Sequence, residues 1–235
     1  MGSQILFGET FRILEGGKEW LRVALEFDSS EGWLEKDSIH MVDETAGTGS
    51  GAEFGPRLVV RPSIAVVDMD QGHQMILPAG SVWVGSAGLT TTIYGRHFEL
   101  LSEEGLMIPG KENDPEEIGK WLLSIPGLHG GRCGFGFDGP GLVQMICRTM
   151  GRTIPRDCRG QAGEGSNIHL LHEARKGDLA FFDEGGELIH VGMVLGGGMI
   201  LHAADQVRID RLDHQGIFNA EKQVYTHRLR IIKRI

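Results

Sequence analysis

The stretch that decides the fold runs from residue 135 to residue 144, and it reads Phe135-Gly136-Phe137-Asp138-Gly139-Pro140-Gly141-Leu142-Val143-Gln144. Asp138 is a good helix N-cap, because its side chain can accept a hydrogen bond from a free backbone N–H of the first turn. Leu142, Ile146 and Met150 then recur at helical spacing and form one apolar face. The stretch therefore predicts an apolar helix from about residue 139 to residue 150.

A second helix is predicted just upstream. Asp114 suits its N-cap and Pro115 its first position, and Pro126 ends the apolar stripe that follows. Strand patterns come after both helices, around residues 178–182, 190–195, 199–203, 207–210 and 224–232. Helices followed by antiparallel strands are typical of an α+β domain, here residues 111–235.

The N-terminal residues 1–43 read as four short strands with tight turns, which predicts a small β-barrel. Residues 44–57 are rich in Gly, Ser and Thr and are predicted to form a linker. Residues 58–110 are again β-rich and predict a second β domain. The tryptophans of the two β regions, Trp20, Trp33 and Trp83, are most simply barrel core.

Composition excludes several classes of function. The chain has 235 residues and a net charge of -9, which disfavours nucleic acid as a partner because phosphate binding needs clustered Lys and Arg. No run of eighteen apolar residues predicts a membrane span. No signal peptide is visible; an export signal upstream of this sequence would place the protein in the cell envelope or periplasm. Three clustered cysteines do not form a secreted disulfide framework.

Two histidines give the chain a possible chemistry. A thiol at a helix N-terminus is favoured as thiolate, a histidine on a neighbouring strand takes its proton, and a third polar group orients that histidine. His190 and His202 flank a tight glycine turn, so they can face each other as base and orienter. At the start of the helix, however, Gly139 stands where the thiol would be.

These motifs carry a resemblance to a known family. Residues 111–235 resemble an NlpC/P60 domain, the papain-like family of cell-wall peptidases, and the spacing of short motifs in residues 1–43 resembles bacterial SH3 (SH3b) domains. Residues 58–110 would be a second, divergent SH3-like domain. The matching motifs in the C-terminal domain are Gly130-Gly131-Arg132, Phe135-Gly136-Phe137-Asp138, Gly141-Leu142-Val143-Gln144, Ile154-Pro155-Arg156-Asp157, Gly177-Asp178-Leu179, His190-Val191-Gly192 and His202-Ala203.

The resemblance implies a fold, a reaction and a set of site residues. The whole chain is similar to SH3b-linked γ-D-glutamyl-diamino-acid endopeptidases, with His190 as general base and His202 as its orienter. Asp138 and Asp157 would line a pocket for an amine of the peptide stem, and Arg156 and Cys158 would border it. The resemblance implies no cofactor, and no ligand pair in the sequence has a recognised zinc spacing, so no metal site is expected.

The departures from the family pattern weigh against catalysis. Where the family has Asp-Cys-Ser-Gly, this chain has Asp138-Gly139-Pro140-Gly141, and Gly127 replaces an aromatic residue of the pocket. The favoured hypothesis is a catalytically inactive homologue that binds a peptidoglycan stem peptide or a protein partner. The alternative is an active cysteine endopeptidase with a displaced nucleophile, Cys133 or Cys158, neither of which is expected to begin a helix. A purely structural interaction module is a third hypothesis.

Overall fold

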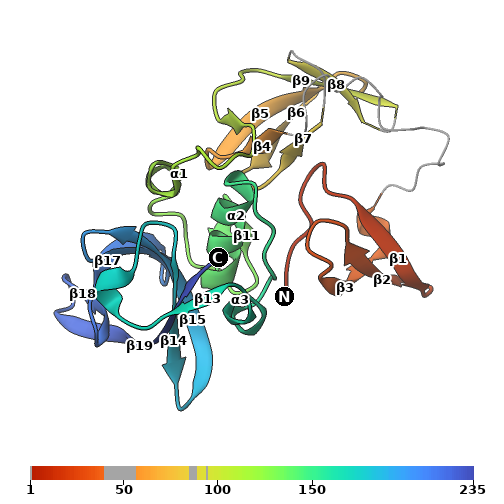
Figure 1. The fold of residues 1–235 in the computed structure, drawn as a ribbon. Helices are drawn as coiled ribbons and strands as arrows, with labels where there is room; N and C mark the ends of the chain where they lie inside the picture. Colours follow the sequence, from red (N-terminus) through yellow and green to blue (C-terminus); the bar gives the residue numbers. More distant parts are fainter. Residues whose placement is uncertain (1, 40–56, 85–88, 94) are drawn as a thin grey trace.

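The computed structural model of the protein describes residues 2–39, 57–84, 89–93 and 95–235. Three β-rich parts follow one another along the chain, and the α-helices belong to the C-terminal part (Figure 1). Helix α2 (Gly139–Thr149) lies between the C-terminal barrel and the other two parts. The predicted linker at residues 44–57 lies outside the described residues, apart from Arg57, which begins a strand.

The N-terminal part is a three-stranded antiparallel sheet followed by a short 3-10 helix, η1 (Lys36–Ser38). Its strands are β1 (Phe11–Gly16), β2 (Trp20–Leu25) and β3 (Glu31–Glu35). The prediction that Trp20 and Trp33 are core residues is wrong, since they are 47% and 57% exposed. Both lie on the outward face of the sheet, because the alternation along β2 turns Leu21 and Val23 inward instead.

The middle part holds two small sheets, with strand orders β10-β4-β7 and β6-β5-β9-β8. Its strands are β4 (Arg57–Val59), β5 (Ser63–Asp68), β6 (His73–Pro78), β7 (Val82–Trp83), β8 (Thr90–Ile93), β9 (Arg96–Leu100) and β10 (Leu106–Met107). Trp83 is fully buried here and packs with Val66, Leu77 and Leu100, as the sequence predicts. Four other buried residues of this part join the main core of the C-terminal part, so the two parts share apolar packing: Leu58, Val60, Ala79 and Val82.

The C-terminal part begins with α1 (Pro115–Trp121), and the Asp114 side chain accepts a hydrogen bond from Glu116 N as predicted. The glycine-rich loop before α2 contains a small hairpin, and a short helix and strand follow α2 before the barrel. These elements are β11 (Arg132–Cys133), β12 (Gly136–Phe137), α3 (Cys158–Gly163), β13 (Ser166–Ile168) and the 3-10 helix η2 (Leu171–Glu173). None of the helices in the described part of the chain is long and apolar enough to cross a membrane.

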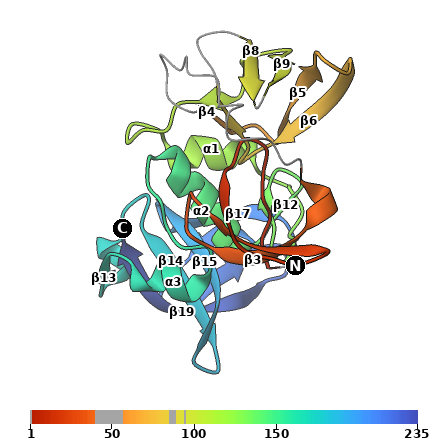
Figure 2. The same ribbon diagram turned by 90° about the vertical axis from the view of Figure 1, so that its right-hand side faces the viewer.

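Six further strands close into an antiparallel barrel beside α2 (Figure 2). They are β14 (Leu179–Glu184), β15 (Glu187–Gly196), β16 (Met199–Ala203), β17 (Val207–Leu212), β18 (Gly216–Asn219) and β19 (Val224–Arg234). The last strand closes the barrel because β19 pairs with both β14 and β18. Leu179 and Phe181 face the helices, whereas Ala180 and Phe182 fill the barrel interior. The α+β, papain-like fold class is confirmed.

The first nine residues tie the three parts together. Phe7 packs edge-on against Phe98 of the middle part, with ring centroids 5.3 Å apart. The fully buried carboxylate of Glu9 pairs with Arg132 at 2.8 Å and with Arg148 of α2 at 2.6 Å. Phe27 lies against the same arginine, 3.9 Å from ring centroid to guanidinium carbon. We call Glu9, Phe27, Arg132 and Arg148 the interdomain ion cluster.

Candidate active site

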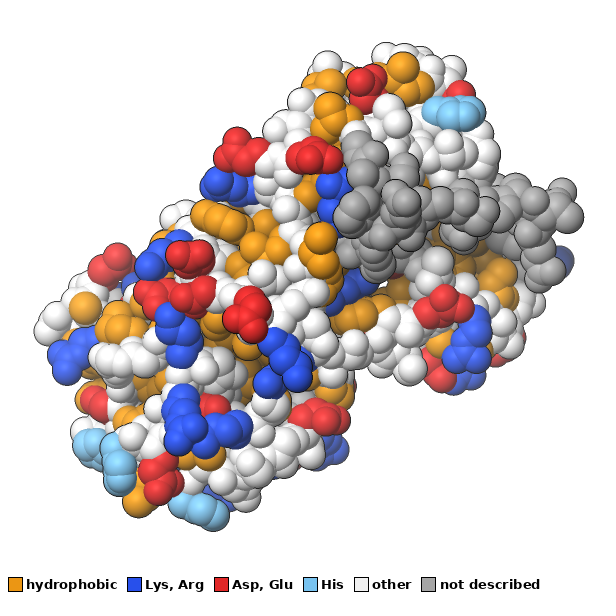
Figure 3. Space-filling model, turned by 45° about the horizontal axis from the view of Figure 1, so that its top comes forward, with side chains coloured by type: hydrophobic (Ala, Val, Ile, Leu, Met, Phe, Trp, Pro, Cys, Tyr) orange, Lys and Arg blue, Asp and Glu red, His pale blue; other side chains and the backbone are white. Residues whose placement is uncertain are grey.

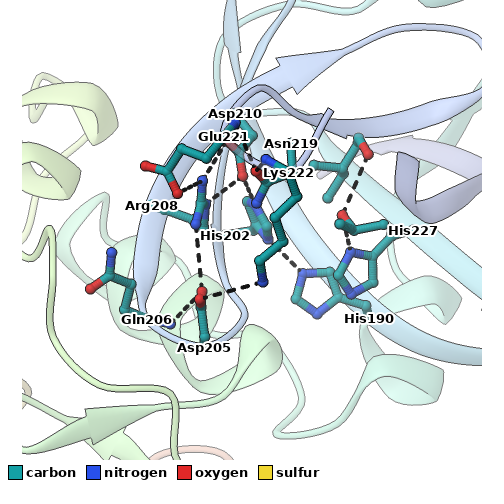
Figure 4. A network of polar contacts seen from close by, with 12 residues as sticks. His190, His202, Asp205, Gln206, Arg208, Asp210, Asn219, Glu221, Lys222 and His227 are labelled. Carbon is teal, nitrogen blue, oxygen red and sulfur yellow. Dashed lines mark hydrogen bonds and ion pairs between the residues drawn. The ribbon is translucent and has the colours of Figure 1, made fainter. Parts of the chain in front are cut away.

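Three strands of the barrel bring a series of polar side chains to the start of α2 (Figure 4). His190 of β15 and His202 of β16 are joined by a 3.0 Å hydrogen bond between Nε2 of the first and Nδ1 of the second. His202 Nε2 lies 3.0 Å from Asp210 Oδ2 on β17. All three side chains are buried. The sequence prediction that His190 and His202 face each other across the glycine turn agrees with this geometry.

The negative charge of Asp210 determines which nitrogen donates and which accepts in each hydrogen bond of the series. Burial raises the pKa of Asp210, but hydrogen bonds from His202 and Arg208 outweigh it and lower that pKa. The ionised carboxylate accepts a hydrogen bond from His202 Nε2–H, and in the tautomer that carries this proton His202 Nδ1 accepts from His190 Nε2–H. His190 Nδ1 is then the bare nitrogen, and it faces Gly139. The arrangement presents a base to the first residue of α2.

A third histidine joins the cluster from β19. The His227 ring stacks on His190, with centroids 4.1 Å apart and planes 24° from parallel. Burial lowers the pKa of His227 to about 4, aided by His202 and opposed by Asp210. Burial also lowers the pKa of His190 well below its usual range, and His227 and His202 add to the effect. Both rings are therefore uncharged at neutral pH.

The space beside Gly139 is narrow. A Cβ atom built on this glycine would lie 2.8 Å from the carbonyl oxygen of Val191 and 3.1 Å from His190 Nδ1. The first contact is to backbone, which cannot turn aside as a flexible side chain can. Gly127 is tighter still, since a Cβ there would lie 2.0 Å from the carbonyl oxygen of Ala204. Side chains at either position therefore require the neighbouring strand to move.

The two aspartates that the resemblance places in a ligand pocket have different surroundings. Asp138 caps α2 by accepting from Gly141 N, also accepts from Gly130 N, and forms a two-bond ion pair with Arg156. Its carboxylate is thus fully hydrogen-bonded within the protein. Asp157 is exposed and caps α3 through Gly160 N, and it has no ion pair with any other described residue. Of the two carboxylates, only that of Asp157 is both exposed and without an ion pair to another described residue.

Cys158 corrects one expectation from the sequence, because it is the first residue of α3 and so does begin a helix. Burial raises its pKa to about 12, and the carboxylates of Asp138 and Asp157 act in the same direction. Cys133 is buried, and neither thiol has a hydrogen bond to a histidine among the residues the structure describes. The helix start does not make a thiolate of Cys158, since these effects outweigh it.

Sequence reasoning missed Asp210, Arg208 and His227. Arg208 donates to both carboxylate oxygens of Asp210, which fixes the acceptor of His202. Charged residues at alternate positions of an apolar strand, as in 207–212, are a signal that could have found this pair. His227 reaches His190 only because barrel closure places β19 next to β14, and no local pattern shows that closure.

Comparison with known proteins agrees with this papain-like architecture. Residues 126–227 match the model of the NlpC/P60 family, and residues 1–39 match that of the bacterial dipeptidyl-peptidase SH3 domain. A crystal structure of an NlpC/P60 family protein from Bacillus cereus ATCC 10987 superposes with a TM-score of 0.81, at 21% identity, over 99% of this chain and 81% of that one. That likeness establishes the shared fold.

Two curated relatives extend the match along the sequence. The gamma-D-glutamyl-L-lysine dipeptidyl-peptidase of Bacillus cereus is 41% identical over 225 residues, and that of Bacillus subtilis is 28% identical over 214. Each alignment covers 86% of this chain, which spans 66% of the first relative and 71% of the second. Residues 126–227 therefore form an NlpC/P60 domain, and residues 1–39 a bacterial SH3 domain.

Proposed function

We propose that this protein is a catalytically silent member of the NlpC/P60 family that binds a peptidoglycan stem peptide beside α2. One observation carries the proposal. The Asp210–His202–His190 series directs a bare nitrogen at Gly139, a residue with no side chain to deprotonate. Loss of the nucleophile from a triad removes most of the rate enhancement, on the order of 10⁶-fold in a serine protease.

The alternative is hydrolysis by a displaced cysteine, and Cys158 is the candidate that begins a helix. A thiol with a pKa of about 12 is protonated at neutral pH, whereas an attacking thiol must be thiolate. We expect no cleavage of L-Ala-γ-D-Glu-containing tripeptides or tetrapeptides by mass analysis. Turnover abolished by Cys158→Ala but not by Cys147→Ala, a buried core thiol, would establish the alternative.

The reactivity of the Cys158 thiol also distinguishes the two functions. Its alkylation by iodoacetamide should rise about tenfold per pH unit between pH 7 and pH 10, since the thiolate fraction does so below the pKa. A rate that levels off near neutral pH would reveal a lowered pKa and an activated nucleophile. Cys158→Ala identifies the signal by removing it from the peptide map.

We expect Asp157 to bind the amine of the stem peptide, because the carboxylate of Asp138 is already paired with Arg156. Calorimetry with L-Ala-γ-D-Glu-containing peptides should show saturable binding that Asp157→Asn weakens about tenfold, as expected for a hydrogen bond to a charged group. Asparagine keeps the N-cap of α3, so the substitution removes charge and leaves the helix intact.

The matched control is Glu164→Gln, which removes one negative charge at the other end of the same helix and should leave binding unchanged. No binding at millimolar peptide would refute the peptide-binding role and leave a protein-interaction module as the remaining function. Equal weakening by both substitutions would show a general effect of charge on the peptide.

A further inference from the structure

The candidate active site contains three histidines, and neither the proposed peptide binding nor hydrolysis requires all three. His190, His202 and His227 each offer one ring nitrogen, and these atoms all lie within 4.8 Å of one another (Figure 4). They come from three different strands of a closed barrel, so their backbones are held in place. We propose that this cluster binds one divalent transition-metal ion, with zinc as the best fit, through one nitrogen of each histidine.

The distances suit an ion of this size. Zinc–nitrogen bonds of about 2.0–2.1 Å in a tetrahedral site place the ligating nitrogens about 3.4 Å apart. His190 Nε2 and His202 Nδ1 are 3.0 Å apart because they share a hydrogen bond, so each nitrogen points at the other. Both rings must turn from this shared line to aim their nitrogens at an ion beside it, and the nitrogens must separate by about 0.4 Å.

His227 must turn further. Its ring is nearly parallel to that of His190, and two parallel rings cannot both aim a nitrogen lone pair at one point. The ring is half-buried, and its one described hydrogen bond is a 2.9 Å contact to the hydroxyl of the adjacent Thr226. Rotation about the side chain therefore breaks one exposed contact and the stack on His190, and it gains a metal bond.

The surroundings of His202 are those of a metal ligand. A ligating histidine usually donates its other ring N–H to a carboxylate, which fixes the tautomer and orients the ring. Asp210 accepts that hydrogen bond from His202 Nε2, and Arg208 holds the carboxylate from its far side. Nδ1 of His202 is thereby left as the ligating atom.

Metal binding requires the proton on His190 Nε2 to leave that nitrogen, and the other ring nitrogen can accept it. When His190 binds the ion through Nε2, its proton moves to Nδ1, and no net proton is released. In an enzyme with a thiol at position 139, Nδ1 would have to stay bare as the base. Gly139 makes no such demand, so the tautomer that binds a metal is compatible with this chain.

A groove reaches the outermost histidine of the cluster, His227. A groove of about 750 Å³ opens beside His227, between the β14–β15 hairpin and the turn before β18. Asp183 and Glu184 lie on its wall and attract cations, although Arg228 lines it too. The fourth position of a tetrahedral ion is left for water or for a carboxylate ligand entering through this groove.

The test is zinc binding by the full chain, freed of tag and treated with chelator. Calorimetry should give one ion per chain, and His227→Gln should weaken binding by more than about 100-fold, since even residues behind a ligand contribute 10–100-fold. His214→Gln is the matched control, because His214 lines the same groove outside the cluster and should not change binding. Asp210→Asn should weaken binding about 10–100-fold.

Cobalt(II) gives a second measurement. A tetrahedral nitrogen site gives strong visible bands without a thiolate charge-transfer band, and Cys158→Ala should leave the spectrum unchanged. The proposal is overturned by equal zinc affinity of His227→Gln and the wild type, by no saturable binding at millimolar zinc, or by loss of the spectrum in Cys158→Ala. Because His227 is half-buried, its substitution keeps the test valid if Asp210→Asn does not fold.

Discussion

The interdomain ion cluster and the histidine cluster are both buried groups of polar side chains at α2, yet they are built differently. In the first, opposite full charges meet at 2.6–2.8 Å, and the Glu9 carboxylate is shared between two guanidinium groups. In the second, the rings of His190 and His227 are uncharged and stacked, and His190 Nδ1 faces a glycine. The difference suits a structural role for the ion cluster, whose charges are paired, and leaves the histidine nitrogens without a charged partner apart from Asp210.

Glu9→Ala should have the largest effect on stability. It leaves Arg132 and Arg148 in a buried site without their anion, and removal of one partner from such a pair costs about 3–5 kcal/mol of unfolding free energy. Urea unfolding measures the change. Glu104→Ala is the control, because its ion pair with Arg61 is exposed and contributes about 0–1 kcal/mol. Similar losses in the two variants would contradict the structural role of the cluster.

Gly139→Ala should have the next largest effect. The added methyl group meets the Val191 carbonyl and the His190 ring, and overpacking of this kind typically costs about 1–3 kcal/mol. Gly163→Ala, at the end of α3, meets no atom within 4 Å and should be neutral or stabilising by up to about 1 kcal/mol. Unfolding curves for the two variants separate the cost of the steric contact at position 139 from the gain in helix propensity. An unchanged unfolding free energy for Gly139→Ala would show that the space beside residue 139 is open.

His227→Gln should have the smallest effect. In metal-free protein it removes one ring stack and no ion pair, so we expect a loss of no more than about 0.5–1.5 kcal/mol. A loss as large as that of Glu9→Ala would mean that the histidine cluster is structural after all. Measurement in chelator is essential, because a bound ion would add its own stabilisation to the wild type.

The charged side chains on the outer surface are arranged differently from those of the buried interdomain ion cluster. On the face shown in Figure 3, acidic and basic side chains lie interspersed over the C-terminal barrel. This mixing is consistent with the sequence argument against nucleic acid, which rests on a net charge of -9. In the interdomain ion cluster, by contrast, the charged groups are buried and directly paired.

Local patterns predicted those elements whose cause is local. Asp114 and Asp138 mark two helix starts where the structure has them, and the strand patterns locate five of the six barrel strands but miss β18. His190 and His202 were found because one glycine turn separates them. His227 was not, since barrel closure brings β19 beside β14, whereas Asp210 was overlooked although it lies on the next strand after His202. The outward face of Trp20 and Trp33 depends on which side of the sheet is covered. The domain boundaries stay predictions.

The tight packing at Gly139 and Gly127 has an evolutionary consequence. Backbone oxygens of Val191 and Ala204 occupy the space that a side chain at each position would need. A cysteine at position 139 would have to displace the Val191 carbonyl before its thiol could be accommodated beside the His190 ring. Evolution of a nucleophile at this position therefore requires a backbone shift as well as a codon change.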